Sequence, residues 1–124
     1  MGQVQLPWSR EEVEATVDSY LQMWLMEQAG QTYSKTAFRR TLLSKLQNRT
    51  EAAVELKHQN ISAILMEHGW QNIPGYKPRG NYQHLLAEVV AARIMVDRRF
   101  DIAADSAANL PATAPPVFTF DNVL

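Results

Sequence analysis

Amide and basic side chains lie close together between residues 54 and 82, in combinations that suit contact with nucleic acid. Lys57 and Asn60 are three positions apart, so both would face the polar side of one helix, with Gln59 beside them. Lysine contacts phosphate as a point charge, whereas asparagine and glutamine form paired hydrogen bonds with an adenine edge. We therefore predict that these residues contact nucleic acid. The alternative is that Asn60 and Gln59 tie the helix to the next loop through bonds from side chain to backbone.

The segment PGYKPRG at residues 74–80 predicts a loop with little backbone freedom. Each proline fixes its own φ and restricts the residue before it, while each glycine adopts angles that other residues avoid. The loop would display Tyr76, Lys77 and Arg79. An aromatic ring and two cations suit a phosphate, a nucleic-acid backbone or an acidic protein surface.

The formal net charge of −1 conceals an uneven distribution. Residues 1–34 hold one Arg against five acids (−4), residues 35–79 hold eight Lys and Arg against three acids (+5), and residues 80–124 hold three against five (−2). Arg39 and Arg40 add to this basic middle from the outer face of a predicted helix. A localised anion-binding surface would have this distribution, although a pI near 6.3 is low for a dedicated nucleic-acid binder.

Four helices would position these side chains. Capping residues and apolar residues at helical spacing predict helices over about 10–28, 35–47, 51–68 and 82–97. The predicted N-caps are Ser9, Ser34, Thr50 and Asn81, and Glu12 completes a capping box with Ser9. Four helices with short connections predict an all-α fold, a compact bundle of about four helices.

The predicted core follows the apolar stripes of these helices. Its members are Val13, Val17, Leu21, Trp24, Phe38, Leu42, Leu46, Val54, Ile61, Leu65, Tyr82, Leu85, Leu86, Val89 and Val96. His58 occupies the stripe between Val54 and Ile61, so we predict a hydrogen-bonded core histidine; a ligand contact is the alternative.

The chain has 124 residues, the size of one domain. We assign residues 1–97 to the helical domain and the Ala/Pro-rich residues 98–124 to a linker or tail. The sequence lacks a signal-peptide pattern, a run of apolar residues long enough for a membrane span, and cysteine, so we expect a cytoplasmic protein that makes no membrane contact.

Catalytic patterns are weak, so we predict that the chain is not an enzyme and has no metal site or cofactor. Glu55 and Lys57 have the E-x-K spacing of PD-(D/E)xK nucleases, but they lie in a helical pattern rather than on a strand. The three histidines lack metal-ligand spacing, and no glycine-rich phosphate loop or nucleophile elbow is visible.

Three segments, WSREEVEATVDSYLQM, KHQNISAIL and IPGYKPRGNYQ, resemble a helical amino-terminal domain of bacterial restriction-type proteins, placed ahead of HNH endonuclease or related effector modules. The likeness covers residues 8–97, and the family pattern is roughly W-S-x-x-E-V, E-x-K-H-x-N-I-S and G-Y-K-P-x-x-N-Y. The matching residues are Trp8, Ser9, Glu12, Val13, Glu55, Lys57, His58, Asn60, Ile61, Ser62, Gly75, Tyr76, Lys77, Pro78, Asn81 and Tyr82. The resemblance implies a targeting or accessory domain of a DNA-acting defence protein, with the tail as a tether.

Together these observations predict a non-catalytic DNA-recognition or targeting domain that uses a basic helix and the GYKPRG loop. The predicted contacts with DNA are Arg39, Arg40, Lys57, Gln59, Asn60, Tyr76, Lys77 and Arg79. The alternative is a protein-interaction or dimerisation module that positions an effector or nuclease domain.

Overall fold

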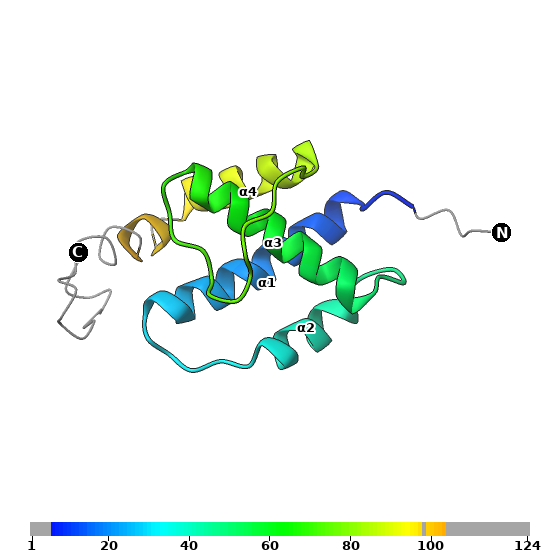
Figure 1. Cartoon of the computed structure of the whole chain (residues 1–124), viewed down its shortest axis with the longest axis horizontal. Helices are drawn as coiled ribbons and strands as arrows, with labels where there is room; N and C mark the ends of the chain where they lie inside the picture. Colours follow the sequence, from blue (N-terminus) through cyan, green and yellow to red (C-terminus); the bar gives the residue numbers. More distant parts are fainter. Residues whose placement is uncertain (1–5, 98, 104–124) are drawn as a thin grey trace.

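The computed structural model describes residues 6–97 and 99–103. Within these ranges the regular elements are helices, with no strand: α1 (Arg10–Gln28), α2 (Lys35–Leu43), α3 (Glu51–Glu67) and α4 (His84–Val96), shown in Figure 1. Residues 99–103 form one further helical turn. Helix α1 packs against the other three helices, and α3 packs against α2 and α4. The predicted all-α class and compact bundle are confirmed.

Local sequence accounts for where three of the helices begin. The Ser9 hydroxyl accepts a hydrogen bond from the Glu12 N–H (3.1 Å), and the Glu12 carboxylate accepts one from the Ser9 N–H (3.1 Å), which completes the predicted capping box. Ser34 and Thr50 cap α2 and α3 as predicted, because each side chain accepts a bond from the N–H three residues later.

Two helix boundaries differ from the predictions. Helix α2 ends at Leu43 rather than near residue 47, because the N–H groups of Lys45 and Leu46 bond three residues back and tighten the chain into turns. Helix α4 begins at His84 rather than directly after Asn81. Asn81 has a left-handed φ of 60°, whereas an N-cap needs extended backbone, and Gln83 occupies the cap position without a side-chain bond.

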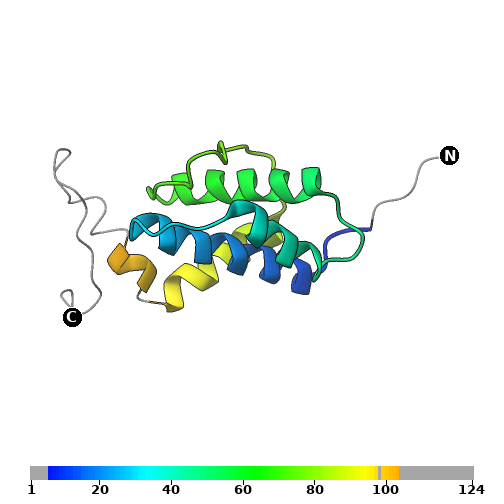
Figure 2. The ribbon, with the colours of Figure 1, turned by 90° about the horizontal axis from the view of Figure 1, so that it is seen from below.

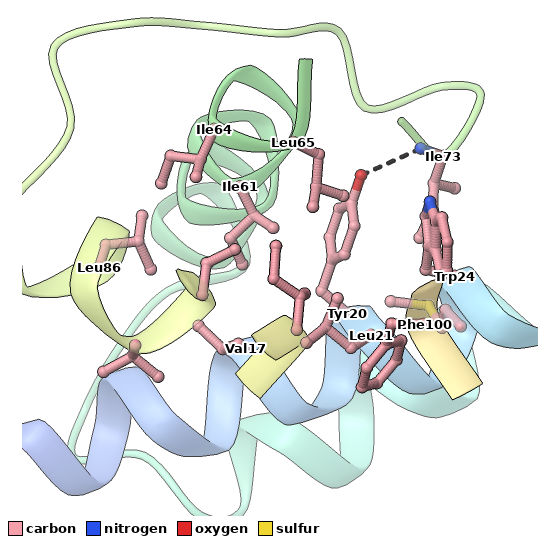
Figure 3. Close-up of a cluster of buried hydrophobic side chains, with 14 of the residues drawn as sticks. Val17, Tyr20, Leu21, Trp24, Ile61, Ile64, Leu65, Ile73, Leu86 and Phe100 are labelled. Atoms are coloured by element: carbon pink, nitrogen blue, oxygen red, sulfur yellow. Dashed lines mark hydrogen bonds between the residues drawn. The ribbon is translucent and has the colours of Figure 1, made fainter. Parts of the chain in front are cut away.

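The core lies where α1, α3 and α4 meet (Figure 3). Tyr20 and Leu21 of α1 pack among Ile61 of α3 and Leu86 of α4, all of them buried. Val96, predicted to face inward, is instead 80% exposed. It is the last residue of α4, and the following helical turn supplies the next core residues.

Phe100 and Ala103 of this turn are buried, and the Phe100 ring lies 6.1 Å from the Trp24 ring. The packed region therefore extends past residue 97, the predicted end of the domain. The rest of the predicted linker, residues 104–124, lies outside the described residues.

A buried ion pair joins the start of α1 to the connection between α2 and α3. Arg49 donates two hydrogen bonds to the Glu12 carboxylate, from Nη2 to Oε1 (2.8 Å) and from Nε to Oε2 (2.9 Å). Its guanidinium also donates to the carbonyl groups of Leu6 (2.8 Å) and Pro7 (3.1 Å) and lies 4.8 Å from the Trp8 ring centroid. The two charged side chains are only 4% and 5% exposed, so little water screens the pair.

Replacing Arg49 by Met should lower the free energy of unfolding by about 3–5 kcal/mol, because the buried Glu12 carboxylate would lose its partner. The loss should be smaller in the double variant Glu12→Gln/Arg49→Met, which buries no charge at this site. Urea denaturation measures both values. Arg10→Met is the control: it removes an exposed pair with Glu14 and should cost about 1 kcal/mol or less. Equal losses in Arg49→Met and Arg10→Met would show that the buried pair is not a major contributor.

The same pair predicts acid sensitivity. Hydrogen bonding to Arg49 lowers the pKa of the Glu12 carboxyl from its ordinary value of 4.5 to about 2, although burial opposes the shift. Because the unfolded chain binds the proton first, the contribution of the pair is complete above about pH 4.5 and is lost as the pH falls toward 2.

Candidate nucleic-acid interface

The loop between α3 and α4, residues 68–83, lies over α3 (Figure 2). Asn60 of α3 holds its second half, because Nδ2 donates to the carbonyl groups of Arg79 (2.7 Å) and Gly80 (3.2 Å). The Arg79 N–H donates to the Gln59 carbonyl (3.0 Å). Asn60 therefore has the alternative role, that of tying the helix to the loop, and with 4% exposure its side chain is not presented to a nucleobase. Gln59 takes part through its backbone.

Helix α1 holds the first half of the loop. The Tyr20 hydroxyl accepts a hydrogen bond from the Ile73 N–H (3.0 Å), drawn as a dashed line in Figure 3. It is also bonded to the Ser62 hydroxyl (2.8 Å) inside the core. Burial raises the pKa of the Tyr20 phenol to about 12, so it stays neutral at physiological pH. The Trp24 indole donates to the Gln71 carbonyl (2.7 Å). The stiffness predicted from the prolines is thus reinforced by side chains from two helices.

Tyr76 lies in the core rather than on display. Its side chain is 6% exposed, and its ring lies 4.8 Å from the His58 ring and 6.1 Å from the Tyr20 ring. Lys35 of α2 covers it, with Nζ 4.9 Å from the ring centroid and 2.5 Å from the Pro74 carbonyl oxygen. The prediction that the loop displays Tyr76 is therefore wrong, because the ring is buried and anchors the loop.

Lys77 and Arg79 are exposed on this anchored loop. Within residues 6–97 and 99–103, neither side chain forms an ion pair with an acid. Their charges are therefore directed to solvent from a backbone whose position is fixed on both sides.

The other predicted cations are placed differently. Lys57 is half-buried, with Nζ 3.2 Å from Gln83 Oε1 and 5.1 Å from the Trp8 ring centroid, and burial lowers its pKa. Arg39 forms an ion pair with Glu51 (3.1 Å). Arg40 is exposed on α2. Lys57 and Arg39 thus form polar contacts with other side chains of the protein, unlike Lys77 and Arg79 on the loop.

A pocket of about 410 Å³ lies between α3 and the loop. Its lining comprises Leu56, Asn60, Arg79, Gly80 and Asn81. The Arg79 guanidinium and the Asn81 amide beside Leu56 suit a flat polar group such as a nucleobase edge, whereas the Asn60 amide is already bonded to the loop. The sequence assigned Asn81 to a helix cap; its left-handed backbone instead places it at this pocket.

No protein-family model, curated protein or solved structure matches the chain. In the described part of the chain, no group of three or more His, Asp or Glu residues is arranged to hold a metal ion. No helix there is long and apolar enough to cross a membrane.

His58 is buried beneath the loop, with 1% of its surface exposed. Its core position agrees with the prediction, but Nε2 has no hydrogen-bond partner, so the predicted bonding is not seen at that atom. Burial, with a smaller effect from the charge of Arg39, lowers the pKa of the imidazole from 6.5 to about 4. The neutral ring fits its apolar and aromatic surroundings, whereas a protonated ring would not.

This shift predicts a pH dependence that His58→Phe should remove. Between about pH 6.5 and 4 the unfolded chain binds a proton that the folded chain does not, so stability should fall by up to about 1.4 kcal/mol per pH unit as the pH is lowered. Urea denaturation across this range measures the slope, and His58→Phe should flatten it. Equal slopes in the wild type and His58→Phe would contradict the assignment.

Proposed function

We propose that this chain is a non-catalytic DNA-recognition or targeting domain in which Lys77 and Arg79 contact the phosphate backbone. One observation carries the proposal: two exposed cations lie on a loop held to α3 by the bonds of Asn60 and to α1 by those of Tyr20 and Trp24. A loop that is ordered before binding loses less conformational entropy on association. The net charge of +5 over residues 35–79 supports the same conclusion.

The pocket beside Arg79 supports base contact in addition to phosphate contact. Arginine pairs with guanine and asparagine with adenine through two parallel hydrogen bonds. Arg79 and Asn81 both line this pocket. In a restriction or defence protein of the kind that the sequence resembles, such a domain would direct a nuclease or another effector module to its target.

A salt series tests the phosphate contacts. The logarithm of affinity for a short DNA duplex should fall linearly with the logarithm of salt concentration, and Lys77→Ala and Arg79→Ala should each reduce the slope by roughly 0.9. Fluorescence anisotropy measures the affinities on unmodified and modified duplexes. Arg10→Ala removes an exposed cation of α1 and should leave the slope unchanged. Absence of duplex binding at low salt, or slopes indifferent to both loop substitutions, would refute the proposal.

Asn60→Ala tests the anchoring of the loop. It should lower the free energy of unfolding by about 1–3 kcal/mol, because two carbonyl groups lose their donor. DNA affinity should weaken by a similar factor at every salt concentration while the slope is kept, because no phosphate contact is removed. Gln59→Ala is the matched control, since only its backbone bonds to the loop, and it should change neither property. Equal effects of Asn60→Ala and Gln59→Ala would show that the anchor is unimportant.

A further inference from the structure

Three consecutive residues of the anchored loop, Arg79, Gly80 and Asn81, form one wall of the pocket between α3 and the loop. All three are exposed. The backbone of this wall is held from α3, because Asn60 Nδ2 donates to the carbonyl groups of Arg79 (2.7 Å) and Gly80 (3.2 Å). The wall is therefore ordered before any ligand arrives.

The polar groups that remain available on this wall are mainly hydrogen-bond donors. Arg79 forms no ion pair within residues 6–97 and 99–103, and its guanidinium carries five N–H donors. The N–H groups of Gly80 and Asn81 form no hydrogen bond with another described residue. In contrast, the carbonyl groups of Arg79 and Gly80 already accept from Asn60. A ligand with two neighbouring acceptors would satisfy these donors.

The space beside these donors is open. Gly80 contributes only backbone atoms to the lining, and a Cβ at this residue would meet no other heavy atom within 4 Å. Gly80 is also not one of the glycines with a left-handed φ, so the backbone does not require glycine here. A ligand can therefore approach the N–H groups directly, and a larger side chain at Gly80 would occupy that space without a clash in the fold.

Leu56 distinguishes a base from a phosphate as the occupant. Its side chain is 40% exposed and lines the pocket from α3. A phosphate gains nothing from an apolar surface, whereas the flat ring of a base would remove apolar area from water against it. In a protein that binds DNA, the groups at this pocket thus favour the edge of a base.

Guanine is the base whose major-groove edge presents two neighbouring acceptors, O6 and N7. Adenine presents one acceptor beside an amino group, cytosine an amino group, and thymine one acceptor beside its methyl group. We propose that the pocket selects guanine, with O6 and N7 accepting from the Arg79 guanidinium and from the N–H groups of Gly80 and Asn81. The inference rests on the proposed DNA-binding function and adds a base preference to it.

Analogues of guanine test the two acceptors separately. Selection from a library of duplexes with a randomised centre should enrich guanine, and fluorescence anisotropy then measures the affinity for an enriched duplex and its analogues. At one guanine, 7-deazaguanine lacks the N7 acceptor and should weaken binding about tenfold, whereas hypoxanthine keeps O6 and N7 and should change it by about twofold or less. Enrichment of adenine or of no base, or equal weakening by the two analogues, overturns the proposal.

Gly80→Leu tests the pocket within the protein. The leucine side chain should cover the N–H donors, so the preference for guanine over 7-deazaguanine should fall from about tenfold to about twofold or less. The salt slope of DNA binding should stay the same, because no charge is removed. Thr36→Leu, an exposed residue of α2 outside the pocket, is the matched control and should keep the preference. Equal preferences in Gly80→Leu and Thr36→Leu overturn the proposal.

Nuclear magnetic resonance of the wild-type chain separates the base preference from DNA binding. Guanosine monophosphate should shift the amide signals of Gly80 and Asn81, and inorganic phosphate at the same concentration should not. Equal shifts with phosphate would assign the pocket to an anion and overturn the proposal. Salt-dependent duplex binding without a base preference would overturn this inference alone. Absence of duplex binding, with the shifts from guanosine monophosphate retained, would overturn the DNA-binding function and leave the guanine pocket.

Discussion

The Glu12 carboxylate is the group on which much of this fold depends, because it satisfies several backbone and side-chain donors at once. It accepts bonds from the Ser9 N–H, the Gln47 N–H and two nitrogens of Arg49. These donors belong to the start of α1 and to the connection between α2 and α3. A single buried anion thus fixes where α1 begins and where α3 can lie, and the position of α3 determines that of the loop.

A few polar side chains at the boundary of the core hold the loop against the helices. The side chains of Asn60 and Tyr20 form hydrogen bonds with the loop backbone. The Tyr76 ring is buried against His58. An exposed loop is usually the most variable and mobile part of a domain. Here its backbone has partners inside the protein, while the side chains of Lys77 and Arg79 face solvent.

Features set by neighbouring residues were predictable from the sequence. The capping box of Ser9 and the caps at Ser34 and Thr50 form within three positions, so local chemistry determines them. Features set by distant contacts were not. Nothing near Arg49 in the sequence indicates its partner 37 positions away, and the burial of Tyr76 depends on three helices meeting beneath it. The exposure of Lys77 and Arg79 agrees with the prediction from the segment PGYKPRG, in which Pro74 and Pro78 restrict the loop.

The contact of Lys35 with the loop has a consequence for cooperativity. Helix α2 has only nine residues and no acid in its first turn, and Lys35 places a positive charge where the helix dipole disfavours it. Such a segment would be a weak helix in isolation. The Lys35 ammonium donates a hydrogen bond to the Pro74 carbonyl and lies over the Tyr76 ring. These contacts stabilise both α2 and the loop. The two segments should open together in amide hydrogen exchange, as one unit of local unfolding.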